Sequence, residues 1–146
     1  MVELMIVVVI IAILSAIAVP SYLKYSQRSR RSDAMAALSQ DQGILERCYA
    51  QKFDYNQVTV TGSGCGSLST TAANPSPKTY YNVALTFPAP ASTGAAITSY
   101  TLAATPAAGS PQLKDTQCAT ITLTSANART ARDSGGGVQD TTCWQQ

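Results

Sequence analysis

The residue types that carry out most protein chemistry are scarce in this chain. It contains no histidine, which excludes Ser-His-Asp and Cys-His nucleophilic catalysis and the H-E-x-x-H metal motif. Ser21 and Lys24 have the S-x-x-K spacing of penicillin-binding enzymes, but neither S-D-N nor K-T-G follows. The chain therefore carries none of these catalytic motifs in full.

The sequence also gives little support to a metal site or a cofactor. Its four cysteines lack C-x-x-C spacing, and no histidine is available to complete a zinc site. Asp133 and Asp140 flank three consecutive glycines, but two carboxylates are few against the ~6–8 oxygen ligands of calcium. We interpret this stretch as a flexible surface turn and expect neither metal nor cofactor.

The cysteines instead indicate disulfides. An even number of them in a small chain rich in Ser, Thr and Gly predicts two bridges. Disulfides persist in oxidising compartments, so the folded part is expected in the periplasm or outside the cell. Spacing alone leaves three pairings open among Cys48, Cys65, Cys118 and Cys143.

The N-terminal segment is strongly apolar. Ser15 is the only polar residue in the stretch 4–19, which as a helix spans roughly 24 Å and approaches a membrane span. Glu3 precedes this stretch, and basic residues follow it, which is the reverse of a signal peptide. A carboxylate facing hydrocarbon costs ~2.5 kcal/mol or more, so we expect Glu3 to have a functional partner.

The position of the basic residues conflicts with that of the cysteines. Lys24, Arg28, Arg30 and Arg31 follow the apolar stretch, and by the positive-inside rule they would place the bulk of the chain in the cytoplasm. The cysteines place it outside. The conflict disappears if a short basic leader preceded Met1 and was removed, which we expect.

The next segment is predicted to be an amphipathic helix. Residues 21–51 contain no proline and one glycine, and they are rich in Ala, Leu, Arg and Gln. Apolar residues from Ala34 to Tyr49 fall on one arc at ~100° per residue, and Asp41 shares that arc without an evident partner. Pro20 makes the junction of the two helical halves a weak point.

The remainder of the chain alternates loops with strands. Residues 52–79 are predicted to be loop, with a short strand around Val58 and Val60. The runs YYNVALTF, SYTLAA and CATITLT alternate apolar with polar or small residues, which predicts an antiparallel meander. The apolar face of this sheet must be buried against another element, and the amphipathic helix is the partner available. We therefore predict an α+β fold, in which the C-terminal half of a long N-terminal helix packs on a small antiparallel sheet. The N-terminal half of the helix protrudes. We divide the chain into an apolar segment, residues 1–24, and a globular domain, residues 25–146.

The stretch VELMIVVVIIAILSAIAVPSYLKY closely resembles the N-terminal segment of type IV pilins of the type IVa-like group. The match extends from residue 2 to about residue 31. It implies a subunit that starts as an inner-membrane precursor, is processed by a prepilin peptidase, and is moved by the pilus assembly machinery into a helical filament with copies of itself or other pilins. It implies a long helix, a variable loop, an antiparallel sheet and a C-terminal disulfide loop. It also implies that the subunit itself is not an enzyme.

The resemblance also suggests roles for particular residues. Glu3 matches the acid that pairs with the N-terminal amine of a neighbouring subunit, although Met1 stands here where the family has a phenylalanine and a few further residues. Pro20 matches the helix-breaking proline, so we expect loss of helix over residues 11–20 in a filament. The residues assigned to assembly are Glu3, Leu4, Ile10, Ile11, Leu14 and Pro20. The family's C-terminal disulfide implies Cys118 with Cys143, which leaves Cys48 with Cys65.

The leading functional hypothesis is a structural subunit of a type IV pilus that serves motility, adhesion or DNA uptake. The alternative is a minor pilin that primes assembly or binds a ligand such as DNA or a surface through residues 52–79 and 130–146. A secretion-system pseudopilin is a third, less favoured reading. The basic cluster Lys24, Arg28, Arg30 and Arg31 is compatible with lipid headgroups, DNA or acidic residues of adjacent subunits, and we favour inter-subunit contact. We expect the protein in the inner membrane before assembly and in an extracellular pilus afterwards.

Overall fold

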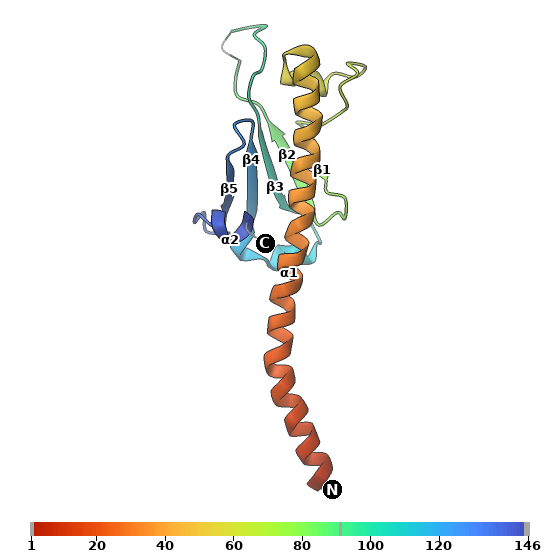
Figure 1. Cartoon of the computed structure of the whole chain (residues 1–146), viewed down its shortest axis with the longest axis vertical. Helices are drawn as coiled ribbons and strands as arrows, with labels where there is room; N and C mark the ends of the chain where they lie inside the picture. Colours follow the sequence, from red (N-terminus) through yellow and green to blue (C-terminus); the bar gives the residue numbers. More distant parts are fainter. Residues whose placement is uncertain (1, 91, 145–146) are drawn as a thin grey trace.

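The computed structural model describes residues 2–90 and 92–144, and its most prominent element is one long helix (Figure 1). Helix α1 extends without interruption over Val2–Lys52, a length of about 77 Å at ~1.5 Å per residue. Pro20 lies inside it, although proline removes one backbone hydrogen bond of the helix. The expected loss of helix over residues 11–20 concerns the filament and stays a prediction.

The two halves of α1 differ in what surrounds them. Residues 2–25 are exposed throughout, and this half projects away from the rest of the molecule (Figure 1). In the second half, Ala34, Leu38, Leu45 and Cys48 are buried. The predicted architecture, with one half packed on a sheet and the other protruding, is therefore confirmed.

The sheet is antiparallel and its strands follow one another in chain order, β1-β2-β3-β4-β5. The three predicted strands correspond to β2, β3 and β4. The strands are β1 Asn74–Pro75, β2 Tyr81–Thr86, β3 Thr101–Pro106, β4 Thr120–Thr124 and β5 Arg129–Arg132.

Strand register places the apolar residues on the face covered by α1. Leu85 pairs with Leu102, and Leu102 pairs with Leu123; all three are buried. Because side chains alternate along a strand, the opposite face carries short polar residues such as Thr101 and Thr122. The core is thus a single layer of aliphatic and tyrosine side chains between α1 and the sheet.

One predicted strand is wrong. The chain around Val58 and Val60 forms a 3-10 helix, η1 Tyr55–Thr59. Asp54 caps it by accepting a hydrogen bond from the backbone N of Asn56 at 3.0 Å. Val58 is buried. The spacing of the two valines therefore reflects the packing of Val58 in the core and not the alternation of side chains along a strand.

The structure contains further short elements that were not predicted. They are β1, β5, the 3-10 helices η2 Pro111–Lys114 and η3 Thr116–Cys118, and a short helix α2 Asp140–Trp144. The sequence of β1 includes a proline and that of β5 is RTAR, so neither shows apolar alternation. The positions of β1 and β5 depend on hydrogen bonds to other strands rather than on the strand preference of their own residues.

Candidate functional site

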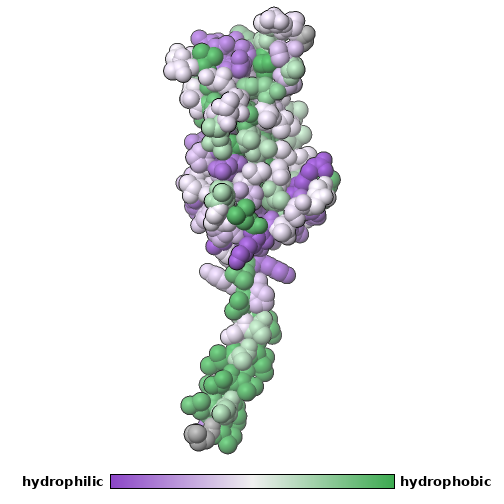
Figure 2. Space-filling view, turned by 180° about the vertical axis from the view of Figure 1, so that it is seen from behind, coloured by the Kyte–Doolittle hydropathy of each residue, from purple (hydrophilic) through white to green (hydrophobic). Residues whose placement is uncertain are grey.

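The residues assigned to assembly all lie on the projecting half of α1. The exposed fractions of Leu4, Ile10, Ile11 and Leu14 are between 51% and 67%, values far above those of core residues. The space-filling view shows this half as an apolar stalk below a mixed polar body (Figure 2). So large an apolar surface is unusual for a soluble monomer and indicates burial in a membrane or against other chains.

Six cations surround α1 where it leaves the globular part, and we call them the basic collar. They come from three segments of the chain: Lys24, Arg28, Arg30 and Arg31 from α1, Lys78 from the turn before β2, and Lys114 from η2. Strongly hydrophilic residues are visible at this end of the body, next to the stalk (Figure 2). The sequence revealed only the four collar members on α1.

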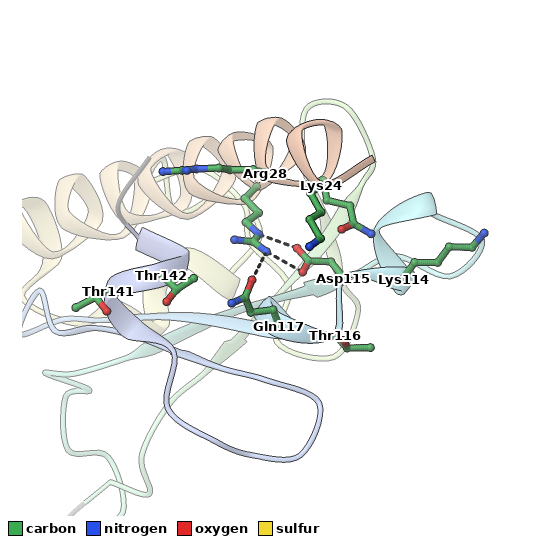
Figure 3. Close-up of a pocket in the computed structure, with 10 residues that line it drawn as sticks. Lys24, Arg28, Lys114, Asp115, Thr116, Gln117, Thr141 and Thr142 are labelled. Carbon is green, nitrogen blue, oxygen red and sulfur yellow. Dashed lines mark hydrogen bonds and ion pairs between the residues drawn. The ribbon is translucent and has the colours of Figure 1, made fainter. Parts of the chain in front are cut away.

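One groove beside α1 is lined by four of these cations (Figure 3). It has a volume of about 550 Å³ and lies between α1, the η2–η3 segment and α2. Its charged lining consists of Lys24, Arg28, Arg31 and Lys114 against the single carboxylate of Asp115. The groove is therefore net positive and suited to an anion.

Arg31 and Asp115 form a buried ion pair at the floor of this groove. Arg31 Nε donates to Asp115 Oδ2 at 2.7 Å and Nη2 donates to Oδ1 at 2.8 Å. Gln112 Nε2 also donates to Asp115, at 2.8 Å, and to the carbonyl of Gln27, at 3.1 Å. Arg31 thus fixes η2 on α1 within the chain. Inter-subunit contact stays a prediction for Lys24, Arg28, Arg30 and Arg31.

A second groove, of about 280 Å³, lies on the other side of α1. The guanidinium carbon of Arg30 sits 5.5 Å from the ring centroid of Tyr80, within the range of a cation–π contact. Asp33 accepts hydrogen bonds from the backbone N of Lys78 at 3.0 Å and of Tyr80 at 3.4 Å. This buried carboxylate holds the turn before β2 against α1 and so places Lys78 in the collar.

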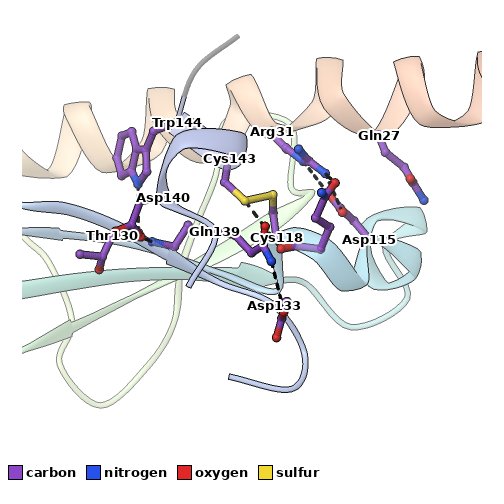
Figure 4. The surroundings of a disulfide bond; sticks show 12 residues. Gln27, Arg31, Asp115, Cys118, Thr130, Asp133, Gln139, Asp140, Cys143 and Trp144 are labelled. Atoms are coloured by element: carbon purple, nitrogen blue, oxygen red, sulfur yellow. Dashed lines mark hydrogen bonds and ion pairs between the residues drawn. A yellow bond between two sulfur atoms is a disulfide. The ribbon is translucent and has the colours of Figure 1, made fainter. Parts of the chain in front are cut away.

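The C-terminal segment closes the free edge of β5 (Figure 4). A disulfide joins Cys118 to Cys143, and a second joins Cys48 to Cys65; these are the pairs that the pilin resemblance implies. Ala131 of β5 donates its N–H to Asp140 at 2.6 Å and accepts a hydrogen bond from Gln139 N at 2.9 Å. The edge strand is therefore covered by the chain itself.

Two exposed arginines lie on β5 next to this C-terminal segment. Arg129 lies 5.4 Å from the ring centroid of Trp144, whose indole N–H donates to the carbonyl of Thr130 at 2.9 Å. Arg132 donates one hydrogen bond to the carbonyl of Gly136 at 2.9 Å. Each guanidinium is held in place yet keeps further donors directed at solvent.

The carboxylate of Asp133 organises the backbone of the glycine turn. Asp133 accepts hydrogen bonds from the N–H groups of Gly137 and Gly135 at 2.8 and 2.9 Å, and the bond from Gly137 contributes most to lowering the pKa of Asp133. A side chain at position 137 would collide with the Asp133 carboxylate, 2.6 Å from an added Cβ. In residues 2–90 and 92–144, no three His, Cys, Asp or Glu side chains lie close enough together to hold a metal.

A family comparison identifies the chain. The family model described as "Type IV minor pilin ComP, DNA uptake sequence receptor" matches residues 20–122, well over half of the sequence. The chain belongs to this family. A ComP-family member is a pilin and not an enzyme. A search of curated proteins finds no match.

The family match and the N-terminal resemblance are largely independent. The ComP family match begins at residue 20, whereas the pilin resemblance rests mainly on the apolar segment before it. Both indicate that the chain is a type IV pilin. Within the match lie the basic collar, the loop after α1 and strands β1 to β3, while β5 and the C-terminal loop follow it.

Proposed function

We propose that this chain is a minor type IV pilin that binds DNA for uptake, rather than the main structural subunit favoured by the N-terminal segment alone. The observation that carries the proposal is the match of residues 20–122 to a family described as a DNA uptake sequence receptor. This match supports the minor-pilin alternative. Among motility, adhesion and DNA uptake, it favours DNA uptake as the role of the pilus.

We further propose that residues 1–24 anchor the chain in the inner membrane and later enter the core of the filament. Helix α1 is long and apolar enough to cross a membrane by length and composition. Residues 25–146, with both disulfides, would then lie on the outer side. This arrangement gives a prepilin peptidase and the assembly machinery access to the precursor, and it gives Glu3 a neighbouring subunit as partner.

The proposed DNA surface is formed by exposed cations away from the collar. Arg129 and Arg132 border the C-terminal loop, and Arg47 and Lys52 border the loop that follows α1. Arg47 is held by a hydrogen bond to the carbonyl of Cys65 at 3.3 Å. An anchored guanidinium loses less side-chain entropy when it binds a phosphate, because its position is already restricted.

Duplex binding by the full-length chain in mild detergent tests this proposal. Fluorescence anisotropy at several salt concentrations would be compared for the wild type, R47Q/K52Q and R129Q/R132Q, with K24Q/K114Q as the matched control. Removing one cation that touches a DNA phosphate should reduce the slope of log K against log salt by ~0.9. We expect a reduction in at least one of the first two variants and none in the control.

A random-sequence duplex library tests the receptor role itself. A receptor for an uptake sequence should enrich one sequence over repeated rounds of selection, because base contacts add to the phosphate contacts. If the wild type binds duplexes no better than an unrelated pilin, the DNA-binding proposal is wrong. The composition of sheared filaments tests the minor role: a minor subunit should be a small fraction of the protein in them.

A further inference from the structure

We propose that the groove between Lys24 and Lys114 binds phosphate headgroups of the bilayer leaflet in which α1 is anchored. The inference rests on the membrane-anchored stage of the proposed function, and it assigns that stage a lipid-binding site. The site would fix the orientation of the globular part relative to the membrane before assembly.

Lys24 lies at the depth of the lipid headgroups. The apolar stretch ends at Val19, so Lys24 lies about 7 Å further along the helix axis at ~1.5 Å per residue. Each headgroup layer is roughly 5–7 Å thick. Residues 4–24 span about 30 Å, which is roughly the thickness of the hydrocarbon core, so Lys24 lies where one headgroup layer begins when Leu4 lies at the opposite boundary. Because Lys24 and Lys114 line the same groove, the fold brings Lys114 to that level as well.

The groove has an excess of positive charge. Asp115, its only carboxylate, already accepts hydrogen bonds from Arg31 and Gln112. In the part of the chain that the structure describes, neither Lys24 nor Lys114 forms an ion pair with a carboxylate. Both lysines are exposed at the rim, and Figure 3 shows them on different elements of the same groove. A phosphate between them would be contacted from α1 and from η2.

The opposite side of the helix carries two tyrosines near the depth of Lys24. Residues 24, 28 and 31 lie on one face of α1, and residues 22, 25 and 29 lie on the other at ~100° per residue. Tyr22 and Tyr25 are 70% and 71% exposed, although tyrosine rings are largely apolar. Exposed tyrosines just beyond an apolar span are typical of the membrane interface. The two faces thus place lysines and tyrosines at the same depth.

These observations favour a lipid over DNA at this groove. The groove includes Lys24, which follows the end of the apolar stretch at Val19 by five residues, so headgroups surround it whenever α1 is in the bilayer. A duplex would have to displace those headgroups to reach it. Cations that face a membrane surface gain from anionic lipid without needing a base-specific geometry.

The test uses the full-length chain reconstituted in vesicles of phosphatidylcholine with 30 mol% phosphatidylglycerol. Trp144 is the only tryptophan, and it lies on α2, whose Thr141 and Thr142 line the groove. Energy transfer from Trp144 to trace dansyl-labelled phosphatidylglycerol, compared with dansyl-labelled phosphatidylcholine, reports which headgroup occupies the groove. We expect the wild type to prefer phosphatidylglycerol, and each lysine removed to weaken this preference by up to about fivefold.

K24Q/K114Q is the test variant. K52Q is its control, because Lys52 is an exposed lysine at the other end of α1. The preference for phosphatidylglycerol should fall in K24Q/K114Q and persist in K52Q, with unchanged circular dichroism and disulfides in both.

Equal energy transfer to the two labelled lipids in the wild type, or an unchanged preference in K24Q/K114Q, would contradict the inference. So would a loss of duplex binding in K24Q/K114Q that matches the loss in R129Q/R132Q, because the groove would then bind DNA. If the wild type binds no duplex but retains the lipid preference, the DNA-binding proposal fails and this inference stands.

Discussion

At the scale of single residues, the globular part separates its charges by depth. Asp33, Asp41 and Asp115 are buried, and Glu46 is the only exposed carboxylate that the structure describes beyond residue 24. The cations remain at the surface, with Arg31 as the buried exception. A net charge of only +2 therefore understates how positive the surface is toward an anionic partner.

Asp41 is a buried carboxylate whose loss of solvent is not offset by hydrogen bonds or ion pairs to any described residue. Within residues 2–90 and 92–144 its side chain has no hydrogen bond or ion pair, and burial raises the pKa of Asp41 to about 6. The folded chain then retains this proton to higher pH than the unfolded chain does. Its contribution to stability is fully present below about pH 4 and is lost as pH rises through 6.

We expect D41N to be more stable than the wild type at pH 8, by about 2–3 kcal/mol, and nearly equal to it at pH 4. Urea denaturation of both proteins at the two pH values measures this difference. Comparing the two proteins at each pH cancels the carboxylates whose pKa is lowered, such as Asp54 and Asp133. An equal stability of the two proteins at pH 8 would show that Asp41 is solvated after all.

The ion pair of Arg31 and Asp115 gives a second prediction. R31M removes the partner of a buried carboxylate and should lower the free energy of unfolding by about 3–5 kcal/mol. The double variant R31M/D115L should recover most of this loss, because it leaves no unpaired buried charge. Denaturation of the two variants measures the difference, and a double variant as unstable as R31M would contradict this explanation.

At the scale of elements, the least expected feature is the closure of β5 by the C-terminal segment. Asp140 and Gln139 take up the N–H and the carbonyl of Ala131, and the Cys118–Cys143 disulfide fixes the segment to the residues just before β4. The bridge therefore protects a sheet edge as well as restricting the unfolded chain.

Removing that bridge should affect one edge of the molecule. C118S/C143S is expected to lose about 3 kcal/mol of stability and to show faster amide exchange at Ala131 and Gln139. C48S/C65S is the control: it should lose a similar stability, with faster exchange around η1 instead. Exchange at Ala131 that is unchanged without the C-terminal bridge would mean that the hydrogen bonds alone hold the segment.

At the scale of the whole molecule, the chain has three zones along one axis: the apolar stalk, the basic collar and the polar body (Figures 1 and 2). A chain of this kind is incomplete alone, because its stalk has no partner within the described structure. Under the proposed function, the zones would correspond to bilayer, headgroups and aqueous phase before assembly, and to the filament core and surface afterwards.

Assembly provides the prediction at this scale. In cells that express both proteins, E3A subunits should enter filaments about tenfold less than the wild type if the pairing of Glu3 contributes ~1.4 kcal/mol. E3Q keeps the size of the side chain but removes its charge, so it should behave like E3A. Mass spectrometry of sheared filaments measures the ratio, and equal incorporation would exclude a role of the carboxylate in assembly.

Features that depend on local pattern could be predicted from the sequence. The length and apolarity of the N-terminal segment, the amphipathic second half of the helix and the three central strands follow from periodicity. The pairing of the cysteines came from the family resemblance rather than from spacing.

Which charges lie together depends instead on contacts between distant parts of the chain. Lys78 and Lys114 join the collar because Asp33 and the Arg31–Asp115 pair fix their loops on α1, and these contacts join residues 45 and 84 positions apart. The edge strand β5 likewise forms where β4 and the C-terminal segment provide hydrogen-bond partners. Local sequence carries no signal for such contacts, because their energy arises only when distant segments meet.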